Sequence, residues 1–151
     1  MNVIAGASIR STVSFKALAI GGVAGLAAWE VFARLIAPLW IGEMLDPTPL
    51  VEASFGVGAS SAFIVHVLTG LVAYPVAWRL VVWPIAERLG LPWWLAAIGY
   101  GVGLWVFALG VMAGLVAGFP PFLGFAPLAW ASLVGHVLLA VAAAGAMRAT
   151  E

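Results

Sequence analysis

Four ionisable side chains lie within long apolar stretches of the sequence: Glu30, Arg34, His66 and His136. Burying such groups at membrane depth is costly, so each is a candidate functional residue. Glu30 and Arg34 are four positions apart with the acid first, the order that suits an ion pair within one helix. We expect a neutralised pair near a membrane interface, with the Arg34 side chain extended towards the lipid headgroups. The alternative is that the pair lines a polar path.

The two histidines suggest a cofactor because they are predicted to lie at similar depth on two helices that run in the same direction. If those helices begin near Val57 and Ala126, His66 and His136 each lie roughly 14 Å from one surface. In a four-helix bundle these helices would be diagonal neighbours, a spacing that suits axial ligands on opposite faces of a haem b iron. The alternative is that each imidazole hydrogen-bonds a carbonyl group or a partner subunit. Two histidines without a nearby thiolate or inward carboxylate are too few for zinc, so we expect no metal site.

No set of residues points to catalysis by this chain. The sequence lacks a phosphate-binding glycine loop, an HExxH motif and a Gly-x-Ser-x-Gly motif, so we predict no catalytic residues and no enzyme. There is no cysteine, which excludes thiolate chemistry and disulfides. Six basic and six acidic residues give zero net charge, which argues against binding to nucleic acid.

The elements that carry these residues must sit in lipid. Hydrophobic residues make up 65% of the 151-residue chain and charged residues only 8%, whereas soluble domains carry about 25% charged residues. No Asp, Glu, Lys or Arg occurs from Leu89 to Met147. One helix over that run would be roughly 90 Å long, about three times the hydrocarbon thickness, so the run must fold back on itself. The three prolines within residues 119–127 mark the turn.

These patterns predict a single all-α membrane domain over residues 1–151, an up-down-up-down bundle of four transmembrane helices. The predicted spans are residues 15–37, 55–80, 92–118 and 127–147, with an outer loop over residues 38–54. Pro38 is expected to end the first span, and the Trp83-Pro84 pair lies in the predicted link after the second. The acidic residues of the outer loop are expected to form a solvated surface.

The positions of the cations predict the orientation. Five of the six precede the first span, join the second to the third, or end the fourth; they are Arg10, Lys16, Arg79, Arg88 and Arg148. Because cytoplasmic segments carry an excess of Lys and Arg, both termini are predicted to be cytoplasmic. The expected location is the inner membrane of a bacterium.

Small residues at helical spacing predict how the helices associate, because lipid provides no hydrophobic driving force between them. The expected packing glycines lie on the first and third spans. They are Gly21, Gly25, Gly99, Gly103, Gly110, Gly114 and Gly118.

Several of these features together resemble a family of small four-helix inner-membrane proteins of bacteria that has no assigned activity. The resemblance covers most of the chain: Ala37-Pro38, His66 with Gly70, Tyr74-Pro75, Gly99, Gly103, Trp105 and Gly135-His136. Glu30 departs from it, since Met and Thr are commoner there. The resemblance implies the four-helix topology and no particular activity.

Three functional hypotheses follow. The first is a non-catalytic integral subunit or accessory protein of a larger respiratory or photosynthetic membrane complex, with lipid and other membrane subunits, or itself, as partners. The second is a haem b electron-transfer protein with His66 and His136 as axial ligands. The third is a small transporter or channel, which requires a water-filled cavity that reaches Glu30.

Overall fold

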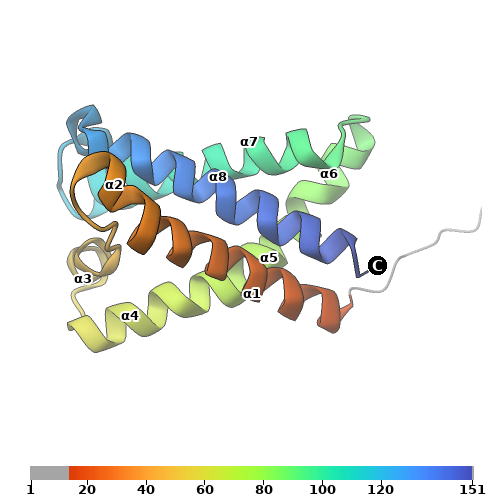
Figure 1. Cartoon of the computed structure of the whole chain (residues 1–151), viewed down its shortest axis with the longest axis horizontal. Helices are drawn as coiled ribbons and strands as arrows, with labels where there is room; N and C mark the ends of the chain where they lie inside the picture. Colours follow the sequence, from red (N-terminus) through yellow and green to blue (C-terminus); the bar gives the residue numbers. More distant parts are fainter. Residues whose placement is uncertain (1–13, 151) are drawn as a thin grey trace, which may run out of the picture.

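The computed structural model describes residues 14–150, and this part of the chain contains helices and turns but no strand. Four helices are long and apolar enough to cross a membrane: Phe15–Ile41, Ala59–Arg88, Trp93–Val116 and Pro127–Arg148. The all-helical membrane fold predicted from the sequence is therefore confirmed at this level. Figure 1 shows the four long helices with their connections at the two ends of the molecule.

Most of these spans are built from several helical segments. The first joins α1 (Phe15–Val31), the π-helical η1 (Phe32–Ile36) and α2 (Ala37–Ile41). The second joins α4 (Ala59–Leu68), η2 (Thr69–Ala73), α5 (Tyr74–Ala77), η3 (Trp78–Val82) and α6 (Trp83–Arg88). The third joins α7 (Trp93–Trp105) and η4 (Val106–Val116), and the fourth is α8 (Pro127–Arg148). Two short helices lie in connections, α3 (Thr48–Phe55) and the 3-10 segment η5 (Pro121–Phe125).

Prolines do not end the first two spans where the sequence predicted. The first helix continues through Pro38 to Ile41, and the second continues through Pro84 to Arg88. In both cases a π-helical turn ends two residues before the proline, and the same holds for η2 and Pro75. A proline lacks the N–H for the usual bond to residue i−4 and its ring crowds that carbonyl group, and a π turn accommodates both defects without ending the helix.

Helix α8 is the central element, because it packs along both α1 and α7. Small residues permit the close approach: a Cβ atom on Gly25 would lie 3.0 Å from the Ala143 Cβ, and one on Gly21 would overlap the Met147 side chain. From α7, Gly101 meets the α8 backbone, where a Cβ would lie 2.6 Å from the Val137 Cα. The helices therefore associate through small residues.

The second and third spans diverge from the turn that joins them. Helix α7 packs against η3 and α6 near this turn, while at the other end α3 lies between them and contacts both α4 and η4 (Figure 1). The predicted outer loop, residues 38–54, is thus largely helical. Its Leu50 packs against the apolar cluster around Trp105 and Leu109, while the acidic residues Glu43 and Asp46 are exposed.

The connection between the third and fourth spans contains a left-handed turn. Phe122, Leu123 and Phe125 have φ values of 52°, 51° and 56°, a region that costs about 1–2 kcal/mol for each residue that bears a side chain. Aromatic packing holds this turn in place. The Phe122 ring lies 4.8 Å from the Trp105 ring and 5.3 Å from the Phe125 ring, centroid to centroid. The Trp105 Nε1–H also donates to the Ala129 carbonyl at 2.8 Å.

Candidate functional site

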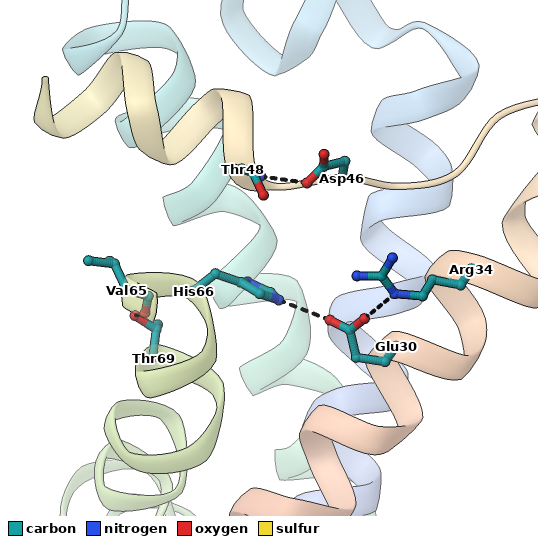
Figure 2. Close-up of polar contacts among 7 residues, drawn as sticks. All are labelled: Glu30, Arg34, Asp46, Thr48, Val65, His66 and Thr69. Atoms are coloured by element: carbon teal, nitrogen blue, oxygen red, sulfur yellow. Dashed lines mark hydrogen bonds and ion pairs between the residues drawn. The ribbon is translucent and has the colours of Figure 1, made fainter. Parts of the chain in front are cut away.

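Glu30 lies at the centre of a polar cluster between the first and second spans. Its carboxylate accepts a hydrogen bond from the Arg34 Nε–H, which is the ion pair expected from the i, i+4 spacing. Its other oxygen lies 3.3 Å from the His66 Nε2 on α4. Figure 2 shows the carboxylate between these two partners. The Arg34 side chain is 55% exposed and that of His66 only 14%, so the cluster runs from the surface into the protein.

The sequence reasoning missed the contact between Glu30 and His66. It paired the glutamate with Arg34, and it gave the histidine either to a cofactor or to a hydrogen bond with a carbonyl group or a partner subunit. Because an ionised carboxylate is an acceptor only, the His66 Nε2 must carry the proton that it donates to Glu30. The His66 Nδ1 is then left with its lone pair when the ring is neutral.

His136 is buried within α8, and its tautomer can be assigned from its partners. The Nδ1 atom lies 2.7 Å from the Ser132 carbonyl oxygen, which accepts but never donates, so the Nδ1 carries the proton. The Ser132 hydroxyl group lies 3.3 Å from the same nitrogen. In the neutral ring the Nε2 is therefore a bare acceptor, and no described protein group hydrogen-bonds to it.

Trp29 brings the two histidines together. Its ring centroid lies 6.2 Å from that of His66 and 4.9 Å from that of His136, the second in an edge-on arrangement. The benzo edge of the indole packs on Gly135, where a Cβ would lie 2.6 Å from the ring. The Nε1 lies on the opposite edge of the indole and is buried without a hydrogen-bond partner among residues 14–150. A buried N–H without a partner is unusual in native proteins and calls for an explanation.

A cavity of about 420 Å³ lies beside this group, in the region where the second and third spans diverge. We call it the chamber. Residues from all four spans and from α3 line it, among them Trp29, Leu50, His66, Met112 and His136. Most of the wall is apolar. Its size falls within the range of cavities that hold small molecules and cofactors. Glu30 is not among the described residues that line the chamber. It is hydrogen-bonded to His66, and His66 does line the chamber.

Asp46 lies on the segment that enters α3 and also lines the chamber. Its carboxylate accepts a hydrogen bond from the Thr48 N–H at 2.9 Å, above the contact between Glu30 and His66 in Figure 2. Hydrogen bonding to Thr48 lowers the pKa of the Asp46 carboxyl group from its usual 3.8, with the Arg34 charge as a smaller cause and partial burial opposing both. Asp46 is therefore ionised at neutral pH. At its other end α3 is held by the Ser54 hydroxyl group, which donates to the Met112 carbonyl oxygen at 3.4 Å.

The glycines predicted to mediate packing divide into three groups. Gly21 and Gly25 lie against α8, and Gly110 and Gly114 lie beneath Phe122 and Pro121 of the turn between the third and fourth spans. Gly99, Gly103 and Gly118 have no atom within 4 Å of an added Cβ, so they do not pack against another helix within the described residues of this chain. Gly99 and Gly103 face away from α8, which Gly101 contacts instead, and Gly118 has a φ of +74° in the turn after the third span. Spacing alone did not identify the contacting face.

No group of three or more His, Cys, Asp or Glu residues within residues 14–150 is arranged to hold a metal ion. Comparison with known proteins adds no assignment, since no family model, curated protein or solved structure matches the chain. The resemblance noted from the sequence therefore stays a prediction, and function must be argued from the chamber.

Proposed function

We propose that this chain is a four-span protein of the bacterial inner membrane that binds a lipid-soluble small molecule in the chamber. In that membrane the protein serves as a non-catalytic subunit or accessory protein of a larger complex. The observation that carries the proposal is a cavity of about 420 Å³ with largely apolar walls, into which two histidines and a buried tryptophan are built. Well-formed apolar pockets with a few converging polar groups are the usual form of small-molecule sites.

The proposed topology alternates in direction, with both termini in the cytoplasm. Lys16 starts the first span, Arg88 ends the second and Arg148 ends the fourth, at the end of the molecule where α6 and the C-terminus lie (Figure 1). A group of tryptophans lies at the same end, as is typical of a membrane interface; they are Trp78, Trp83, Trp93 and Trp94. In this orientation the chamber and α3 lie in the outer half of the membrane.

Purification from the native membrane in a mild detergent tests the proposal. Proteins and small molecules that accompany the chain would be identified by mass spectrometry. We expect both membrane subunits and a lipid-soluble compound. A lone monodisperse chain would contradict the subunit role, and a preparation without any such compound would contradict the binding role.

Haem b is the second candidate occupant, with His66 and His136 as ligands. One observation favours it: the His136 Nδ1–H bond to a backbone carbonyl is the kind of contact that orients a histidine ligand and leaves its Nε2 for iron. His66 fits less well, because its Nε2 is bonded to Glu30 and its ring contacts Trp29. Haem, when bound, would supply electron transfer. A Soret band that is lost in both His66→Ala and His136→Ala would support this candidate, and its absence would remove it.

Transport is the third hypothesis, and it is favoured least. The chamber reaches His66 and Asp46, but the residues that line it are mostly apolar and do not include Glu30. A conducting path through Glu30 would be detected as a substrate flux in proteoliposomes that Glu30→Gln abolishes. Flux that is equal in the variant would exclude that path.

A further inference from the structure

We infer that the chamber recognises an uncharged, lipid-soluble molecule whose polar head group donates a hydrogen bond to the Nε2 of His136. This inference rests on the proposed binding function and specifies the chemistry of the ligand. The simplest such head group is a hydroxyl group on an apolar body.

Trp29 forms the wall of the chamber beside this histidine. It is 5% exposed and lines the chamber, and its ring centroid lies 4.9 Å from that of His136. The benzo edge of the ring is fixed against Gly135, so the indole does not turn without losing that packing. Its Nε1–H is buried and does not open into the chamber, so the ligand contact is assigned to His136.

The acceptor is the His136 Nε2. The Ser132 carbonyl oxygen fixes the proton on Nδ1, so the other ring nitrogen presents a lone pair when the ring is neutral. His136 is 7% exposed and lines the chamber. An oxygen that carries a hydrogen, such as the oxygen of an alcohol or phenol, would donate to it, whereas an ether or a ketone would not.

The charge of the wall favours a neutral molecule. Asp46 is the only Asp, Glu, Lys or Arg among the described residues that line the chamber, and it already accepts from Thr48. A carboxylate or phosphate head group would find no lysine or arginine in the described lining to pair with, and desolvating an unpaired charge is costly.

The test uses the full-length protein in lipid nanodiscs, with empty nanodiscs as the blank, and isothermal titration with four probes. These are a para-alkylphenol, its O-methyl ether, a straight-chain alcohol and a fatty acid of matched length. The phenol ether accepts a hydrogen bond but does not donate one. We expect the phenol to bind about tenfold more tightly than its ether, which is the ordinary effect of one hydrogen bond, and the fatty acid to bind most weakly.

Two variants test the contact with His136. His136→Phe should weaken phenol binding about tenfold and leave ether binding unchanged, which also shows that the variant is folded. Trp94→Phe, half-exposed and remote from the chamber, is the matched control and should change neither.

The outcomes distinguish the inference from the proposed function. Phenol and ether that bind equally, or a fatty acid that binds best, would overturn the head-group assignment while the chamber remained a binding site. If no probe binds saturably to the native protein, the proposed function itself fails. An alcohol that binds as well as the phenol would show that the hydroxyl group alone is recognised, and weaker binding of the alcohol would show that the aromatic ring contributes as well. Both results support the inference.

Discussion

Gly101 should be far less tolerant of alanine than Gly99 or Gly103 on the same helix. A Cβ at Gly101 would lie 2.6 Å from the Val137 Cα and 2.8 Å from the His136 carbonyl oxygen, both backbone atoms of α8. This separation is about 1 Å shorter than the ordinary 3.5–4.0 Å between carbon atoms. Backbone of a packed helix does not yield as a flexible side chain does, so α7 and α8 must separate.

The expected cost of Gly101→Ala is about 1–3 kcal/mol, the range for overpacking a close contact. Gly99→Ala and Gly103→Ala meet no atom within 4 Å and should be neutral, or stabilising by up to about 1 kcal/mol through helix propensity. The free energy of unfolding would be measured by chemical denaturation in mixed micelles. Equal effects of the three substitutions would refute the reasoning, because the three glycines share the same sequence context and differ only in the face that they occupy.

Three further predictions concern the half of the molecule that contains α3. Trp105→Phe should cost about 1 kcal/mol of stability, since it removes the hydrogen bond to Ala129. Hydrogen bonding lowers the pKa of Asp46 in the folded protein. The ionised Asp46 carboxylate therefore makes its full contribution to stability at pH values above 3.8, the usual pKa of the group. This contribution is lost as the pH falls through the lowered pKa. In the Asp46→Asn variant, the temperature of thermal unfolding should therefore fall less steeply as the pH is lowered through this range. Glu30→Gln should cost about 1–3 kcal/mol, because it leaves the Arg34 charge without its partner inside a membrane-spanning helix.

Each of these three predictions has a clear contrary result. A Trp105→Phe protein as stable as the native chain would show that the bond to the carbonyl group makes no net contribution. If the unfolding temperature of Asp46→Asn falls at low pH as steeply as that of the native protein, other carboxyl groups cause the acid sensitivity. A Glu30→Gln protein as stable as the native chain would show that the ion pair with Arg34 makes no net contribution to stability.

The existence of the four spans follows from the sequence because hydropathy and length are sufficient to define a membrane helix. Their ends were less predictable. A proline normally ends a helix, but π turns before Pro38 and Pro84 let both helices continue. The packing face of the third span was not predictable for a different reason. Where every face is apolar, no periodicity separates the side that meets α8, at Gly101, from the side that bears Gly99.

The candidate site was predicted in part. The cost of burying ionisable groups identified Glu30 and both histidines without any knowledge of their contacts. The contact between Glu30 and His66 joins residues on different spans, and nothing in the local sequence encodes it. The start of helix α3 could have been predicted from the sequence. Asp46 lies two positions before Thr48, and a proline follows Thr48, a pattern that is typical of a helix start. Leu50 of that helix then completes the wall of the chamber.

The most direct test of the chamber is to fill it. Ala108 of the third span lines the cavity, whereas Val106, two residues away, is 42% exposed and does not line it. Saturable binding of the para-alkylphenol would be titrated in nanodiscs for the native protein, Ala108→Trp and Val106→Trp. A binding chamber predicts that Ala108→Trp abolishes binding and that Val106→Trp binds like the native protein. Equal binding by all three proteins would place the probe outside the chamber and contradict the account.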